Sequence, residues 1–230
     1  MTSPSANIRP MTNESALTNR KQHWEGVYTN KPSDRLVWYQ PHLLTALAWI
    51  RDLNLPRDAA IIDVGGGAST LVDDLLADGF TSLTVVDLSA TALEVSRHRL
   101  GEFAGAVRWL TGDIITLELP AHQFDLWHDR AAFHFLTDPA DQQRYRDQVL
   151  HALNPGGHLL LGTFSPEAPP RCSGLPVRRY AETDLVDVFG IRLELQRSKK
   201  ELHVTPAGVE QMYLYCHFLS TTEAPDPGRG

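Results

Sequence analysis

The sequence predicts an α/β fold with a mainly parallel sheet, and three observations predict it. The apolar run Ala59–Val64 leads straight into a glycine-rich turn, as a buried parallel strand before a ligand-binding loop does. The run Thr81–Asp87 ends in an acid, and a helix is expected after each run, with apolar residues at helical spacing after the first and a Ser89 cap at the start of the second. Near the end of the chain, residues 192–204 and 211–219 alternate polar and apolar side chains, which is typical of an antiparallel pair.

The composition is that of a globular protein with one sizeable core. The 230 residues are 42% hydrophobic and 21% charged, and no apolar run approaches the length of a membrane span. The first ten residues carry no secretory signal and two cysteines give no disulfide framework, so we expect a cytoplasmic protein. The formal charge of −7 argues against a nucleic-acid partner, because phosphate binding usually leaves a basic footprint.

We expect one domain between two polar tails. Residues 1–17 are rich in Ser, Thr, Asn and Pro and are predicted to form a flexible tail, as are residues 221–230. The domain then covers residues 18–220, and its residues 18–56 form N-terminal helices, including one over Pro41–Leu53. The oligomeric state is open between a monomer and a homodimer.

Three glycines, Gly65 to Gly67, follow the first strand directly. Glycine permits a tight turn and lets a ligand approach the backbone, so a nucleotide-type site is expected at the carboxyl end of the sheet. A dinucleotide fingerprint would need a glycine where Thr70 stands, and a phosphate-binding P-loop would need a Gly-Lys-Ser/Thr ending. These differences disfavour a nicotinamide-dependent reductase. The other alternative to a nucleotide-type site is a glycine turn in some other α/β fold.

An acid at the tip of the second strand, Asp87, is the expected ribose ligand. A carboxylate can accept hydrogen bonds from both vicinal hydroxyls of a ribose. The alternative is an acid near a helix N-terminus that interacts only with the helix dipole.

The glycine loop and its preceding acid, Asp63, resemble the first motif of class I S-adenosylmethionine (SAM) methyltransferases, an acid followed by G-x-G. Ser69 replaces the family's third glycine, which resembles the subgroup that holds the citrate synthase and elongation factor 1A lysine methyltransferases. Five matches lie in family order between Ala59 and Phe164. They are Asp63 with its glycines, Asp87, Gly112-Asp113, the strand Phe124–Arg130 with its exit, and the turn Asn154–Gly157 before a fifth strand.

The resemblance implies a Rossmann-like three-layer sandwich, with a seven-stranded, mostly parallel sheet that contains one antiparallel strand. It implies SAM as the cofactor, with the loop backbone against the methionine moiety and Asp113 at the adenine amino group. The expected cofactor-binding residues are Trp24, Tyr28, Trp38, Asp63, Gly65, Gly66, Gly67, Ser69, Asp87, Leu88, Asp113, Ile114 and His128.

Aromatic residues crowd the segment between Thr18 and Gln40. This segment resembles the N-terminal segment of the same subgroup, which folds over the cofactor as part of a lid. Aromatic faces near a sulfonium attract it by cation–π interaction, worth about 1–2 kcal/mol. The alternative is that these aromatic side chains pack the first helices on the sheet.

The exit of the fourth strand is where the family places groups that face the transferred methyl. Strand alternation puts Trp127 and Asp129 on one face and His128 on the other. We expect Asp129 or His134 to face the acceptor as the catalytic residue, with a base needed only if the acceptor still carries a proton. A structural role for each histidine is the alternative.

The loop Arg171–Tyr180 is the second place to look for acceptor contacts. Its arginines could bind an anionic acceptor such as a carboxylate, and a solvated loop is the alternative. The expected substrate-binding residues are Tyr39, Arg130, Arg171, Cys172 and Arg178. The ten histidines form no ligand-like cluster in the sequence, so we expect no metal.

The expected function is SAM-dependent methyl transfer to a small-molecule acceptor, because the chain adds no recognition domain. A protein lysine is the alternative that the subgroup resemblance implies. An acid-lined aromatic slot would favour lysine, and an arginine-lined slot would favour an anion. A non-catalytic SAM-binding protein of the same fold is the third possibility, since fold alone does not fix function.

Overall fold

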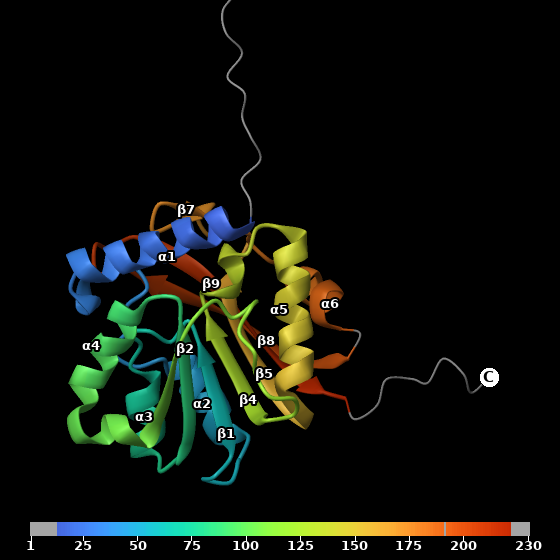
Figure 1. Cartoon of the computed structure of the whole chain (residues 1–230). Coiled ribbons are helices and arrows are strands. Elements are labelled where there is room, and N and C mark those ends of the chain that lie inside the picture. The colour runs from blue at the N-terminus through green and yellow to red at the C-terminus, as the bar shows by residue number, and fades with distance from the viewer. Residues whose placement is uncertain (1–12, 191, 222–230) are drawn as a thin grey trace, which may run out of the picture.

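The computed structural model describes residues 13–190 and 192–221, and one sheet runs through its centre (Figure 1). The strand order of this seven-stranded sheet is β3-β2-β1-β4-β5-β9-β8. Its strands are β1 (Ala60–Val64), β2 (Ser82–Asp87), β3 (Val107–Thr111), β4 (Phe124–Arg130), β5 (Leu153–Phe164), β8 (Leu193–Val204) and β9 (Glu210–Ser220). The first five strands pair in parallel, and β9 pairs antiparallel with both β5 and β8. One strand therefore runs against the others, and the predicted fold class is confirmed.

Helices cover both faces of the sheet and make a three-layer sandwich. They are α1 (Asn13–Asn30), α2 (Leu44–Asp52), α3 (Leu71–Ala77), α4 (Ala90–Leu100), α5 (Pro139–Ala152) and α6 (Glu182–Phe189), with short 3-10 helices η1 (Ser33–Arg35), η2 (Gly101–Ala106) and η3 (Phe133–Phe135). Strand alternation divides the core, because neighbours such as Ile61 and Ile62 point to opposite faces. Ile61 packs with residues of α2 and α3, and Ile62 packs with residues of α5 and α6.

Several helix ends follow directly from the sequence. The Ser89 hydroxyl accepts a hydrogen bond from the Ala92 N–H and caps α4, and the Asp138 carboxylate caps α5 at the Ala140 N–H. Gly79 has a φ of +89° and ends the helix turn after α3, as its position in the sequence predicts. These local signals fix where α3 ends and where α4 and α5 begin.

Two boundaries differ from the sequence-based expectation. Residues 13–17 of the predicted N-terminal tail begin α1, and residues 1–12 and 222–230 of the two predicted tails lie outside the described residues. The predicted turn Asn154–Gly157 belongs to β5, whose pairing with β4 shifts register there. Gly156 has a φ of +75°, and a side chain at Gly157 would press on the Asn154 carbonyl, so two glycines allow the bulge.

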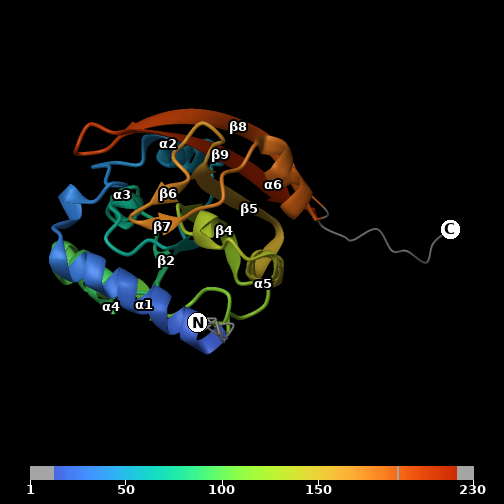
Figure 2. The same cartoon turned by 90° about the horizontal axis from the view of Figure 1, so that it is seen from above.

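Two segments distant in sequence cover the end of the sheet at which β1, β2 and β4 finish. One is α1, and the other is the small hairpin of β6 (Arg171–Cys172) and β7 (Leu175–Pro176), which occupies part of the expected irregular loop. Figures 1 and 2 place both at this end of the sheet. Among the described residues, no helix combines the length and the apolar character that crossing a bilayer requires.

Candidate active site

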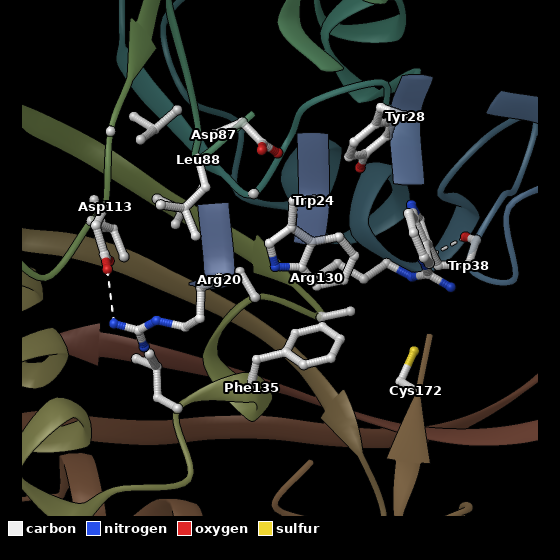
Figure 3. Close-up of a pocket in the computed structure, with 18 residues that line it drawn as sticks. Arg20, Trp24, Tyr28, Trp38, Asp87, Leu88, Asp113, Arg130, Phe135 and Cys172 are labelled. Atoms are coloured by element: carbon white, nitrogen blue, oxygen red, sulfur yellow. Dashed lines mark hydrogen bonds and ion pairs between the residues drawn. The ribbon is translucent and has the colours of Figure 1, made fainter. Parts of the chain in front are cut away.

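A cleft of about 830 Å³, partly open to solvent, lies above the ends of β1, β2 and β4 (Figure 3). One end carries Asp87, Leu88, Asp113 and Ile114, and we call it the acidic end. The other end carries Trp24, Trp38, Arg130, Phe135 and Cys172, and we call it the aromatic end. In Figure 3 the labelled acids and the Arg130–Cys172 side lie on opposite sides of Trp24.

Gly65 of the glycine loop lines the cleft, and each of the three glycines, Gly65 to Gly67, has a steric reason. Gly65 has a φ of +70°, and a Cβ there would lie 2.7 Å from the Ala132 Cβ. A Cβ on Gly67 would lie 2.5 Å from Asp87 Oδ2, and one on Gly66 would overlap the Asp63 carboxylate. The three glycines therefore let two carboxylates fold directly beneath the loop.

A second hollow of about 500 Å³ adjoins the cleft, and we call it the glycine hollow. Asp63, Gly66, Ser69 and His128 line it, together with Tyr39. Asp63 Oδ1 and His128 Nδ1 are 2.7 Å apart, and both side chains are buried. Asp63 Oδ2 and His128 Nε2 are shielded from water and have no hydrogen-bond partner within the described chain. Buried polar atoms are normally paired, so these two atoms are suited to a polar ligand group.

Asp87 lies at the end of β2 and faces the cleft with 8% of its surface exposed. Its Oδ1 accepts a hydrogen bond from the Ser89 N–H at 2.8 Å. Burial raises the pKa of Asp87 to about 7, against the effect of the Ser89 hydrogen bond, and the nearby Asp63 adds to the rise. The carboxyl group therefore changes charge near neutral pH.

Asp113 is paired with an arginine that the sequence did not suggest as a site residue. Arg20, on α1, contacts Asp113 Oδ2 at 3.0 Å and Asp141 at 3.2 Å. Burial raises the pKa of Asp113, and the Arg20 charge opposes this effect. No local pattern marks Arg20, because only the tertiary fold brings α1 next to the end of β3.

A second polar contact fixes α1 over the cleft. The Glu25 carboxylate accepts hydrogen bonds from the Ser89 hydroxyl at 2.9 Å and from the Ala90 N–H at 2.8 Å, at the N-terminus of α4. Burial favours protonation of Glu25, but hydrogen bonds from Thr91 and Ser89 outweigh it and lower the pKa of this group. Arg20 and Glu25 thus attach α1 to the sheet ends at two points.

The N-terminal aromatic residues form a continuous wall. Trp24 packs edge-to-face on Trp38, with ring centroids 5.6 Å apart, and on Phe135 at 4.9 Å. Tyr28 packs on Trp38 at 5.9 Å. Phe135, on η3, joins this wall although its apolar stretch gave no signal that it would reach the cleft. The expected residues Trp24, Tyr28 and Trp38 therefore do lie together on the cleft wall.

The structure corrects the expectation that Asp129 faces the acceptor. Asp129 is fully buried on the face of β4 that α5 covers. It accepts hydrogen bonds from the Tyr145 hydroxyl at 2.6 Å, from the Ala132 N–H at 2.9 Å and from the Phe133 N–H at 3.0 Å. Burial raises its pKa to about 6, against these hydrogen bonds. Strand alternation sends Asp129 away from the cleft and sends its neighbours His128 and Arg130 toward it.

His134 is likewise not at the cleft surface. It is fully buried, and its Nδ1 accepts a hydrogen bond from the Phe164 N–H at 3.2 Å. Its ring packs against Phe135 and Phe164. Burial, helped by the Arg130 charge, lowers the pKa of His134 to about 3. His134 is therefore a neutral structural residue, which corrects the second catalytic expectation.

The expected substrate-binding residues divide into two groups. Arg130 and Cys172 line the cleft, and Tyr39 lines the glycine hollow. Arg171 is exposed and donates to the Gly174 carbonyl, and Arg178 donates to Gln142 and lies over the Tyr180 ring at 5.0 Å. Neither arginine lines the cleft or the glycine hollow. In the described part of the chain, no group of three His, Cys, Asp or Glu side chains could hold a metal ion.

Comparison with known proteins gives consistent matches. Residues 61–157 match a family model described as a methyltransferase domain. The chain is 24% identical over 143 residues to EEF1A lysine methyltransferase 2 of Danio rerio, and the aligned region covers 58% of this chain and 61% of that protein. It is 35% identical over 105 residues to an uncharacterized methyltransferase of Mycobacterium tuberculosis, which covers 45% of this chain and 50% of that protein. The chain thus spans less than two thirds of the length of these relatives.

A solved structure extends the likeness to nearly the whole chain. The 1,6-didemethyltoxoflavin-N1-methyltransferase of Burkholderia thailandensis, determined with bound 1,6-didemethyltoxoflavin and S-adenosylhomocysteine, aligns with a TM-score of 0.71. The alignment covers 94% of this chain and 93% of that chain at 20% sequence identity. At this identity the likeness is one of fold.

Proposed function

We propose that this chain, a class I SAM-dependent methyltransferase that resembles the elongation factor 1A lysine methyltransferase subgroup, transfers the methyl group of SAM to a small-molecule acceptor. When bound, SAM supplies an electrophilic methyl group on a sulfonium whose sulfur leaves as a neutral thioether. The protein has to hold donor and acceptor in line, which is a matter of positioning. The observation that carries the acceptor class is the chemistry of the aromatic end: aromatic rings, one thiol and one arginine.

The acidic end has the groups that an adenosine moiety needs. Asp87 would accept hydrogen bonds from the ribose hydroxyls, and these bonds would favour its charged form. Asp113 would meet the adenine amino group, with Ile114 and Leu88 on the ring. An added Cβ on Gly66 or Gly67 would press on the carboxylate of Asp63 or Asp87, so the glycines let these groups stay in place beside the ligand.

The glycine hollow has the groups that a methionine moiety needs. The unpaired Asp63 Oδ2 and His128 Nε2 would bind the amino group, and Ser69 lies on the same wall. Trp24, Tyr28 and Trp38 present aromatic surface to the space between the two moieties. A positively charged sulfonium there would gain about 1–2 kcal/mol from these rings.

Among the described residues that line the aromatic end, none would take a proton from the acceptor. The carboxylates that line the cleft, Asp87 and Asp113, belong to the acidic end. Burial raises the pKa of the Cys172 thiol to about 12, so this group stays protonated. We therefore propose an acceptor whose lone pair is free before it binds, such as an anion or an unprotonated ring nitrogen.

A protein lysine is the second candidate, and the likeness to EEF1A lysine methyltransferase 2 favours it. A lysine ammonium must lose its proton before it can accept a methyl group. Among the described residues that line the aromatic end, none is acidic, and the Arg130 charge would repel an ammonium. This charge pattern favours the small-molecule acceptor.

The test is methyl transfer from radiolabelled SAM over a panel of thiols, amines, carboxylates, ring nitrogens and cell-extract proteins, with small and large products separated. We expect label in small molecules, and much less with Asp87→Asn. Label only in protein would replace this acceptor with lysine. Binding of S-adenosylhomocysteine (SAH) without any transfer would indicate a non-catalytic SAM-binding protein, and no binding of SAM or SAH would exclude the proposed function.

Location, partners and oligomeric state complete the proposed function. We propose that the enzyme acts in the cytoplasm, without nucleic-acid or membrane partners. It would act as a monomer or a homodimer, since the proposed site lies within one chain. Residues 18–220 would form the catalytic domain, and residues 18–56 would supply its lid.

A further inference from the structure

Arg130 stands at the point where the cleft and the glycine hollow meet. It ends β4, and its side chain lies on the same face of the strand as His128. Figure 3 shows the guanidinium beside the indole of Trp38, on the same side of the cleft as Cys172 and across from the acids.

The hydrogen bonds of this guanidinium are incomplete. Its Nε donates to the Tyr215 hydroxyl at 2.9 Å, and its Nη1 donates to the Trp38 carbonyl at 2.9 Å. The group also lies 4.3 Å from the centroid of the Tyr213 ring. Nη2 is shielded from water and has no hydrogen-bond partner among residues 13–190 and 192–221. A buried unpaired donor costs free energy, and on a charged group the cost is greater.

Among the described residues, no carboxylate forms a direct ion pair with Arg130. Across the same described residues, Arg130 makes no ion pair, whereas Arg20, the other cleft arginine, has two carboxylate partners. The nearby acid Glu201 acts on Arg130 at longer range and through Tyr215, which is hydrogen-bonded to both groups, and its carboxylate also accepts from Gln40 and Thr45. Since arginine stays protonated at any physiological pH, the cleft holds a positive charge with free donors.

We propose that Arg130 binds the anionic group of an aromatic acceptor, a carboxylate, thiolate or phenolate on a flat ring. This inference rests on the proposed function and names the substrate class for the same site. The ring would lie against Trp24 and Phe135, and the anionic group would accept hydrogen bonds from Nη2. Because Nη2 is shielded from water, this contact requires a rearrangement of the side chains around it. Aromatic surface and a guanidinium fork together are a suitable site for such an anion.

The carboxylate of the cofactor's methionine moiety has the same chemistry as the proposed acceptor group. Arg130 also lines the glycine hollow, so the experiment must separate the two sources. A residue that holds the cofactor carboxylate affects SAH affinity, and a residue that holds the acceptor does not. SAH affinity is therefore measured for every variant.

The test uses calorimetry with the full chain at saturating SAH. The probes are benzoate and 1-naphthoate, each compared with its neutral amide. We expect the wild type to bind at least one acid about 10-fold or more tightly than its amide, the range for one hydrogen bond to a charged group. Arg130→Met should remove this preference and leave SAH affinity within about 3-fold, a change of well under 1 kcal/mol.

Two further variants keep the test decisive. Arg130→Lys keeps the charge and should keep part of the preference, which also covers the case that Arg130→Met does not fold. Arg178→Met is the matched control, because Arg178 also lies over a tyrosine ring but lies outside the cleft. It should change neither the preference nor SAH affinity.

Three results would overturn the assignment. The wild type could bind no probe acid, or bind acid and amide equally. The preference could survive in Arg130→Met. SAH affinity could fall about 10-fold in Arg130→Met, which would assign Arg130 to the cofactor carboxylate. Failure of the wild type to bind SAH at all would remove the proposed function as well, so the two failures are distinguishable.

Discussion

The acidic end and the aromatic end of the cleft are built from different kinds of chain segment. The acidic end comes from the tips of β2 and β3 and the residues directly after them, such as Leu88 and Asp113. The aromatic end comes from α1, the loop before α2, the tip of β4, η3 and the β6–β7 hairpin. The first is a product of neighbouring parallel strands, and the second exists only after distant segments have packed together.

This difference has a physical consequence for what each end can tolerate. Next to the acidic end, the glycine loop lies directly on the buried carboxylates of Asp63 and Asp87, with less than a methyl group of space. At the aromatic end, Trp24, Trp38 and Phe135 contact one another through ring edges, which allow repacking. We infer that the acidic end fixes one ligand and that the aromatic end adapts to the acceptor.

Gly67→Ala is expected to cause the largest loss of SAH affinity. The new Cβ would lie 2.5 Å from Asp87 Oδ2 and 2.9 Å from the Ala92 Cβ, so the loop or Asp87 must move. We expect SAH affinity to fall by about 100-fold, as overpacking at a rigid site costs about 1–3 kcal/mol. Calorimetry measures it, with Gly105→Ala as control because a Cβ there meets nothing within 4 Å. Equal affinities for the two variants would contradict the tight fit of the loop.

The next effect is that of Asp87→Asn on SAH binding and on its pH dependence. Loss of a charged acceptor should weaken binding by about 10–50-fold. In the wild type the ligand-free pKa of Asp87 is about 7, so binding should weaken as pH falls from 8 to 6. The variant should lose this part of the pH dependence. A wild-type affinity that is flat over this range would show that Asp87 is not the ribose ligand.

The same substitution should act in the opposite direction on the ligand-free fold. The pKa of Asp87 rises on folding from 3.8 to about 7, so its contribution to stability is full below about pH 4 and is lost as pH rises toward 7. Asn cannot ionise, so Asp87→Asn should be more stable than the wild type at pH 8, by about 1–3 kcal/mol. Urea unfolding at pH 8 and pH 5 measures this, and the gain should shrink at pH 5. A variant that is less stable at both pH values would contradict the cost assigned to the buried charge.

Asp129, on the other face of β4, is expected to affect stability and not ligand binding. Tyr145→Phe removes the hydroxyl that donates to Asp129 and should lower the free energy of unfolding by about 1–3 kcal/mol. SAH affinity should stay unchanged, because neither residue lines the cleft. Unfolding by urea and calorimetry with SAH measure the two quantities. A fall in affinity without a fall in stability would return Asp129 to the active site.

Features of the fold and the site that depend on contacts between neighbours in the chain could be predicted from the sequence, and features that depend on contacts between distant segments could not. Asp63, Gly65 and Asp87 follow from strand ends and turn chemistry, which are local, and β4 is found with its predicted bounds. The same alternation already puts Asp129 and His128 on opposite faces of β4, but which face meets the cleft depends on where α5 packs. Arg20 and Phe135 could not be predicted, since their neighbours in the cleft are distant in the chain.

The smallest expected effect is that of Arg20→Met. Arg20 is partly exposed, so its ion pairs with Asp113 and Asp141 are weak, worth about 0.2–1 kcal/mol each. Its loss should raise the Asp113 pKa further and weaken SAH binding by about 2–5-fold at low salt. SAH titrations at low and high ionic strength should show that the difference in affinity between the wild type and Arg20→Met becomes smaller as the salt concentration rises. A difference that is unchanged by salt would contradict an electrostatic role.

The central claim is that one cleft above the ends of β1, β2 and β4 holds the adenosyl ligand. A crystal structure of the protein grown with saturating SAH tests it most directly. We predict the ribose hydroxyls within hydrogen-bond distance of the Asp87 carboxylate and the amino group of the amino-acid moiety beside Asp63 Oδ2. An empty cleft, or SAH bound elsewhere on the protein, would contradict the account.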